Sequence, residues 1–102
     1  MVALPITNEQ LREFCRRWKV AQLAAFGSAL RDDFGPGSDL DLLVTFLPEA
    51  EWSLIDSIQM EGELSELVGR PVDLVSRRAI ERSRNPIRRQ AILGSAKTIY
   101  AA

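Results

Sequence analysis

The sequence predicts an α/β domain: a small mixed β-sheet of three or four strands, with helices mainly on one face and acidic side chains on the other. Acidic and apolar residues alternate at the start of 39–46, which is the period of a half-buried strand. A helical pattern follows over 52–68, and a short apolar run over 71–75 comes next. Strand, helix and strand of these lengths favour a right-handed crossover that joins parallel strands.

The first part of the chain predicts one helix and one buried strand. Thr7 or Asn8 can cap a helix, since Thr and Asn side chains accept hydrogen bonds from the free amides of a first turn. A short apolar run over 20–26 ends at Gly27 and is typical of a buried strand. Residues 28–33 suit one or two helical turns, and the glycines and proline of 34–38 indicate a turn. The helix after Thr7 presents an amphipathic stripe made of Leu11, Phe14, Cys15 and Trp18.

The second part predicts a long helix, a third strand and short closing elements. Gly69 is expected to end the helix over 52–68. Short helices are expected over 78–83 and 86–93, with Pro86 in the first turn of the second. Residues 98–100 suit an edge strand or a last helical turn. The apolar face expected for the long helix consists of Leu54, Ile55, Ile58, Leu64, Leu67 and Val68.

Composition limits the chemistry that this chain can perform. Its 102 residues form one expected domain, 1–102, with the apolar content of a globular protein. The sequence has no histidine, which excludes Ser-His-Asp triads and His-ligated metals. The single cysteine, Cys15, excludes a disulfide framework and is expected to be a buried thiol. No apolar run approaches 18 residues and no signal-peptide pattern is present, so we expect a cytoplasmic protein without membrane contact.

Charge is unevenly distributed along the chain. Acidic residues dominate 32–73, where Arg70 is the only basic residue, whereas 77–97 holds six arginines and a lysine against Glu81. This basic segment can be a contact surface for an acidic partner or a phosphate, or simply a solvated helical face. Direct nucleic-acid binding is not expected, because no aromatic residues are interleaved with these charges and the chain as a whole is slightly acidic.

Three aspartates are the main candidates for a functional site. Residues two apart on a strand point to one face, so Asp39 and Asp41 are expected side by side. Two such charges about 4 Å apart repel by roughly 4 kcal/mol at an effective dielectric near 20, and a hard divalent cation offsets this repulsion. Asp73 lies on the next predicted strand and joins them. The alternative is a turn acid followed by a strand-edge acid with no chemical role.

The pattern of Gly27-Ser28, ten residues, Asp39-Leu40-Asp41 and a later lone Asp73 resembles a known family. It is similar to the minimal nucleotidyltransferase (MNT) domain of the polymerase-β-type nucleotidyltransferase superfamily. The resemblance extends from the first helix to the closing segment 88–100 and implies the polymerase-β-like core fold. One departure is Asp32, which stands where family members often have glycine.

The resemblance implies a metal-dependent transfer chemistry. Asp39, Asp41 and Asp73 would be catalytic and would hold two magnesium ions, with Asp73 alternatively accepting the proton of the attacking hydroxyl. Gly27 and Ser28 would cradle the phosphates of ATP. Arg31 would clamp a phosphate, or instead pair with a neighbouring acid. Ser38 would contact a phosphate, or instead cap a turn.

The resemblance also implies a partner. Small stand-alone MNT proteins act as antitoxins of HEPN ribonuclease toxins by transferring AMP to a tyrosine of the toxin, so we expect a protein adenylyltransferase of this kind. One alternative is a non-catalytic antitoxin that neutralises its toxin by binding alone. Another is a nucleotidyltransferase acting on a small molecule such as an aminoglycoside, which the lack of a separate substrate domain disfavours.

Overall fold

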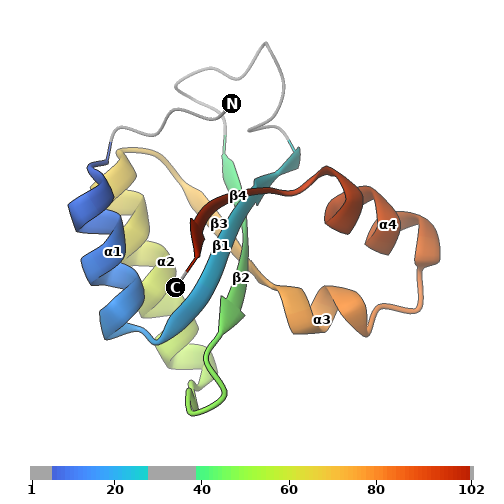
Figure 1. Ribbon diagram of the computed structural model, residues 1–102, viewed down its shortest axis with the longest axis horizontal. Coiled ribbons are helices and arrows are strands. Elements are labelled where there is room, and N and C mark those ends of the chain that lie inside the picture. Colours follow the sequence, from blue (N-terminus) through green and yellow to red (C-terminus); the bar gives the residue numbers. More distant parts are fainter. Residues whose placement is uncertain (1–5, 28–38, 102) are drawn as a thin grey trace.

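A computed structural model describes residues 6–27 and 39–101 of the chain as a mixed sheet with helices on both faces (Figure 1). The sheet has four strands in the order β3-β2-β1-β4. β2 is antiparallel to β1 and parallel to β3, and β4 is antiparallel to β1. The predicted α/β class and the parallel crossover are therefore confirmed. The elements are α1 (Asn8–Arg17), β1 (Val20–Phe26), β2 (Leu40–Phe46), α2 (Leu54–Val68), β3 (Val72–Ser76), α3 (Arg77–Glu81), α4 (Pro86–Ser95) and β4 (Lys97–Ala101).

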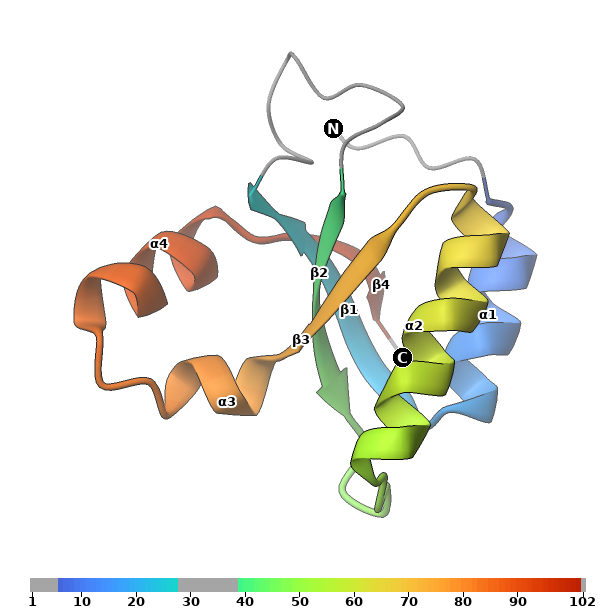
Figure 2. The same ribbon diagram turned by 180° about the vertical axis from the view of Figure 1, so that it is seen from behind.

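The two helices α1 and α2 lie side by side against one face of the sheet (Figures 1 and 2). Thr7 caps α1 as predicted: its hydroxyl accepts from the Gln10 amide, and the Gln10 side chain accepts from the Thr7 amide. Because the side chains of β2 alternate, its even-numbered apolar residues point toward these helices. The core between the helices and the sheet includes Leu11, Phe14, Cys15, Leu40, Leu42, Val44, Met60, Leu64 and Val68.

The predicted apolar face of the long helix is only partly correct. α2 begins after Ser53 and ends at Gly69, as expected, with Gly69 in the left-handed region at φ 74°. Its buried line is Met60, Leu64 and Val68, with Leu67 partly buried beside it. The prediction was wrong for three residues of the first turns, because each lies roughly a quarter to half a turn around the helix from that line. These are Leu54, Ile55 and Ile58, whose exposed fractions are 78%, 69% and 61%.

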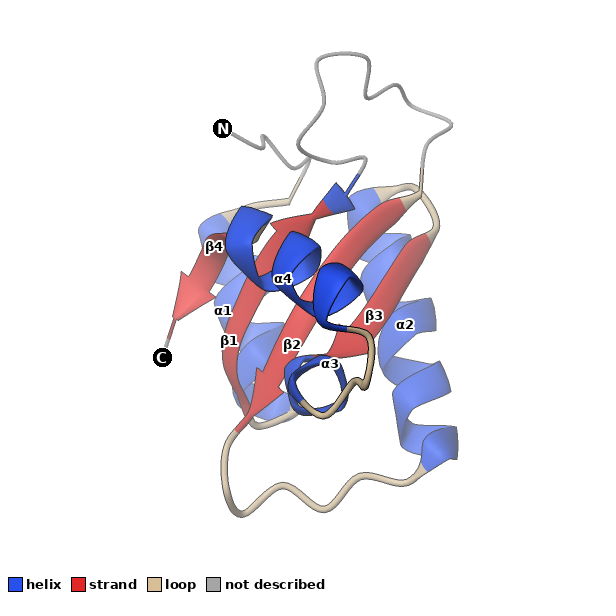
Figure 3. Ribbon diagram, turned by 90° about the vertical axis from the view of Figure 1, so that its right-hand side faces the viewer, coloured by secondary structure: helices blue, strands red, loops and turns tan. Residues whose placement is uncertain are grey.

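The second face of the sheet is covered by α3 and α4 (Figure 3). This placement refines the expectation that the helices lie mainly on one face. A smaller core packs there, in which Ala24, Phe26 and Leu43 from the sheet meet Ile80 of α3 and Ile92 of α4. Within the described part of the chain, no helix is both long and apolar enough to span a bilayer.

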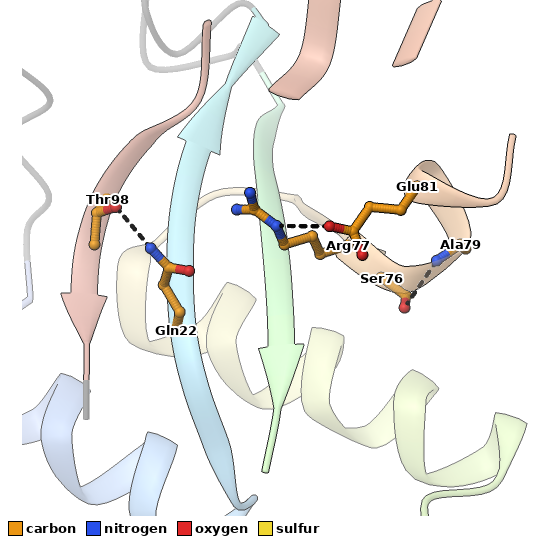
Figure 4. A network of polar contacts seen from close by, with 6 residues as sticks. All are labelled: Gln22, Ser76, Arg77, Ala79, Glu81 and Thr98. Atoms are coloured by element: carbon orange, nitrogen blue, oxygen red, sulfur yellow. Dashed lines mark hydrogen bonds and ion pairs between the residues drawn. The ribbon is translucent and has the colours of Figure 1, made fainter. Parts of the chain in front are cut away.

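Local polar contacts fix the ends of β3 and β4 (Figure 4). α3 starts directly after β3, because the Ser76 hydroxyl accepts from the Ala79 amide at 3.4 Å. At the opposite edge of the sheet, the Gln22 side-chain amide donates to the Thr98 hydroxyl at 2.9 Å and links β1 to β4. The C-terminal segment is therefore an edge strand, the first of the two predicted alternatives.

The outer edge of β3 is covered by side chains of α2. The Leu74 amide donates to Glu61 Oε2 at 2.8 Å, and the Val72 amide donates to the Ser65 hydroxyl at 3.0 Å. Unpaired edge amides can recruit a strand from another chain, so these contacts protect the sheet from such pairing.

A pair of tryptophans joins the end of α1 to the segment before α2. The Trp52 indole donates to the Trp18 carbonyl oxygen at 2.8 Å, and the two rings meet edge to face with centroids 5.2 Å apart. The Trp18 indole donates to Glu63 of α2, which also forms an ion pair with Arg17. This cluster holds α1 and α2 together at the end of the sheet where β1 begins.

Candidate active site

The site starts at Gly27, the residue that follows β1. Its φ of 66° lies in the left-handed region, which glycine adopts without steric cost. A Cβ atom at this position would stand 2.6 Å from Asp41 Oδ2, too close for an ordinary contact. Gly27 thus allows both the backbone turn at the end of β1 and the close approach of the Asp41 carboxylate.

Asp41 and Asp73 are brought together by the register of two parallel strands. Asp41 on β2 is the direct partner of Asp73 on β3, and parallel neighbours of this kind lie about 4.8 Å apart. Asp41 also pairs with Phe26 of β1, next to Gly27. Asp39 stands just before β2, two residues from Asp41, and is exposed. The predicted placement of Asp73 on a strand beside Asp41 is confirmed.

A pocket of about 400 Å³ opens where these residues meet. This volume lies within the range of small-molecule sites. β1, β2 and β3 form one side of the pocket, and α4 forms the other. Its lining residues are Phe26, Gly27, Asp41, Asp73, Val75, Arg88, Ala91, Ile92 and Ser95.

Arg88 is a lining residue that the sequence led us to expect, together with Arg89, as a contact for a partner protein and not as part of this pocket. It belongs to the first turn of α4, which Asn85 caps by accepting from the amides of Ile87 and Arg88. Four lining residues of α4, 88, 91, 92 and 95, follow the spacing of one helix face. That spacing was available in the sequence and could have indicated a common face, although not what the face would meet.

The predicted phosphate ligands and the predicted metal site differ in how far the structure describes them. Ser28, Arg31 and Ser38 lie outside the described residues, so their roles as phosphate ligands stay predictions. Across residues 6–27 and 39–101, no three acidic or thiol side chains gather closely enough to enclose a metal ion. The donor set of Asp41 and Asp73 is nevertheless all oxygen, which suits a hard cation such as magnesium.

The one cysteine takes no part in this site. Cys15 of α1 is fully buried in the core, as predicted, and burial raises the pKa of its thiol to about 12. A thiol with such a pKa stays protonated at neutral pH and is a poor nucleophile.

Comparison with known proteins identifies the family to which this chain belongs. The family model described as a nucleotidyltransferase domain matches residues 7–97. The chain therefore belongs to the nucleotidyltransferase domain family, which confirms the resemblance drawn from Gly27, Asp39, Asp41 and Asp73.

Individual relatives and solved structures in this family are similar to the chain over most of its length. Protein adenylyltransferase MntA of Thermococcus cleftensis is 36% identical over 76 residues, which are 74% of this chain and 75% of that protein. A toxin-antitoxin crystal structure with AMP-PNP superposes with a TM-score of 0.69 at 21% identity, covering 94% of this chain and 75% of that one. A complex of the tri-AMPylated HEPN toxin of Shewanella oneidensis with MNT antitoxin gives a TM-score of 0.56 at 18% identity, covering 92% of this chain and 69% of that one. At these identities the two structures establish the fold.

Proposed function

We propose that this chain is a protein adenylyltransferase that transfers AMP from ATP to a tyrosine of a HEPN toxin and so acts as its antitoxin. The observation that carries the proposal is the pairing of Asp41 with Asp73 in one pocket beside Gly27. Support also comes from MntA of T. cleftensis, a relative named for this activity, and from the AMPylated HEPN toxin found with an MNT antitoxin that has this fold.

The proposed reaction is an in-line displacement at the α-phosphate of ATP. A bond forms between the tyrosine oxygen and the α-phosphorus, the bond to the β-phosphate oxygen breaks, and pyrophosphate leaves. The hydroxyl proton passes to the Asp73 carboxylate or to water. Gly27, which has no side chain, lets the backbone approach the phosphates closely. The open pocket leaves room for an acceptor residue that arrives on another protein.

Magnesium is the cofactor that this donor set fits. Asp41 and Asp73 of the pocket would hold it, and Asp39 is predicted from the sequence to join them, since hard divalent cations prefer carboxylate oxygens. When bound, the ion neutralises charge on the phosphate oxygens and lowers the pKa of the attacking hydroxyl. In the protein without metal, the same carboxylates repel the phosphates of ATP, so binding of the nucleotide is expected to require the ion.

The test is transfer of label from α-³²P-ATP to the purified HEPN partner in the presence of magnesium. We expect wild-type protein to label the partner and Asp41→Asn to fail, although Asp41→Asn should still bind the partner. Glu66→Gln removes an exposed acid on α2, across the sheet from the pocket, and should label normally. A stable wild-type complex that never acquires label from any nucleoside triphosphate would show that neutralisation occurs by binding alone. Label that appears only on small molecules would contradict the protein acceptor.

A further inference from the structure

We propose that Arg88 of α4 binds the α-phosphate of the nucleotide in this pocket. The inference deepens the proposed function by assigning the phosphate contact on the side of the pocket formed by α4. It rests on where α4 lies, on the absence of another partner for the Arg88 side chain among residues 6–27 and 39–101, and on the charge of the pocket.

The course of α4 places Arg88 at the β3 side of the pocket. α4 follows α3, which starts directly after β3, and it leads into β4 beside β1 (Figure 3). The helix thus crosses the sheet from the β3 side to the β1 side. Arg88 and Ser95 lie about 10 Å apart along it, since each residue adds 1.5 Å. Arg88 is accordingly on the side of Asp73, whereas Ser95 is on the side of Gly27.

The Arg88 guanidinium is available for a ligand. Among the described residues it has no ion pair, although its backbone amide is held by the Asn85 cap. Two nearby arginines are engaged differently. Arg89 donates from Nη1 to the Ser83 carbonyl oxygen at 2.8 Å, and Arg77 pairs with Glu81. Exposed and anchored at its backbone, Arg88 can reach a ligand without breaking a polar contact to the described part of the chain.

The charge of the pocket favours a basic side chain at this place. Asp41 and Asp73 supply negative charge, and a nucleoside triphosphate brings more. Arg88 is the only basic side chain among the described residues that line the pocket. Guanidinium groups bind phosphate oxygens with two parallel hydrogen bonds, which combine charge neutralisation with orientation.

The position of Arg88 on the same side of the pocket as Asp73 indicates which of the three phosphates it would bind, namely the α-phosphate. In the proposed function, Asp73 faces the attacking hydroxyl, and the hydroxyl attacks the α-phosphorus. A cation on the same side of the pocket therefore lies near the non-bridging oxygens of that phosphate. The β- and γ-phosphates would extend toward the Gly27 side.

The experiment compares Arg88→Ala, Arg88→Lys and Arg84→Ala by calorimetry with ATP, AMP and adenosine in magnesium. Arg84 is an exposed arginine of the segment between α3 and α4, so its removal changes net charge equally without touching the pocket. We expect Arg88→Ala to lower the affinity for ATP and AMP at least tenfold and to leave the affinity for adenosine unchanged. Arg88→Lys should recover part of the loss, and Arg84→Ala should stay within twofold of wild type. Thermal unfolding should be the same in all four proteins, because both arginines are exposed.

Two outcomes would overturn the inference. One is an ATP affinity of Arg88→Ala within twofold of wild type, and the other is a loss confined to ATP with AMP unaffected. Failure of the proposed function is a separate result. If wild-type protein binds ATP through Arg88 but labels no partner, the proposed transfer reaction is wrong and the Arg88 contact still stands.

Discussion

Replacing Gly27 with alanine tests whether the close approach of this residue to Asp41 matters for binding. The substitution has two physical effects. A side chain in the left-handed region costs about 1–2 kcal/mol. The new Cβ atom also meets Asp41 Oδ2 at 2.6 Å, so the carboxylate must move by several tenths of an ångström. Because a carboxylate ends a flexible side chain, this second effect adds little to the loss of stability.

Gly69 provides a matched control for the backbone effect. It has φ 74° at the end of α2, and a Cβ atom there would meet nothing within 4 Å. Gly69→Ala should therefore lower stability about as much as Gly27→Ala, without moving any side chain of the pocket. For a domain of this size, each 1 kcal/mol corresponds to a decrease in Tm of roughly 4–8 °C.

The two variants should differ in function. Thermal unfolding followed by circular dichroism should give similar decreases in Tm, whereas calorimetry with ATP and magnesium should show weaker binding only for Gly27→Ala. Equal nucleotide affinity in Gly27→Ala and Gly69→Ala, both folded at the assay temperature, would refute the argument that the site depends on the space beside Asp41.

Three further predictions concern stability. Burial raises the Cys15 pKa from 9.0 to about 12 in the folded state. The stability that this thiol contributes is therefore full below pH 9, and the free energy of unfolding falls by up to about 1.4 kcal/mol per pH unit as pH rises toward 12. When the free energy of unfolding is measured in urea at several pH values, Cys15→Ala should lack this part of the decrease. Glu61→Ala should cost about 1.5–3 kcal/mol by removing the charged acceptor of a β3 amide, and light scattering should show more self-association than for the exposed-site variant Glu66→Ala. Ile58→Gln should change unfolding free energy by less than about 0.5 kcal/mol, whereas Leu64→Ala should cost about 2–5 kcal/mol in the same denaturation assay; a large loss in Ile58→Gln would contradict its exposure.

The carboxylates of the site were predictable because they depend on short-range patterns. The strand period places Asp39 and Asp41 on one face, and a strand–helix–strand of ordinary length places Asp73 on the neighbouring strand. The cap at Thr7 and the stop at Gly69 are likewise local features, determined by a few side-chain and backbone preferences. The structure agrees for the Thr7 cap, the Gly69 stop and the pairing of Asp41 with Asp73, whereas Asp39 precedes β2 and its place beside Asp41 stays a prediction.

The features that were missed depend on tertiary packing. Apolar residues at the start of α2 look like core in the sequence, but the sheet meets only the line through Met60, Leu64 and Val68. Similarly, the spacing of Arg88 and its neighbours on α4 defines a face, whereas the side of the sheet on which α4 returns decides that this face meets Asp41 and Asp73. Neither outcome is encoded in a short stretch of residues.

The contact between Trp18 and Trp52 determines what intrinsic fluorescence can report. These are the only tryptophans of the sequence, and they lie where β1 begins, whereas the pocket lies where β1 ends, about 20 Å away for a strand of this length. Their emission should shift to the red when α1 and α2 separate on unfolding, and their edge-to-face contact should give a near-ultraviolet dichroism signal of the intact fold. Nucleotide titrations should leave both signals nearly unchanged, so binding at the pocket needs a probe of its own, such as a fluorescent nucleotide.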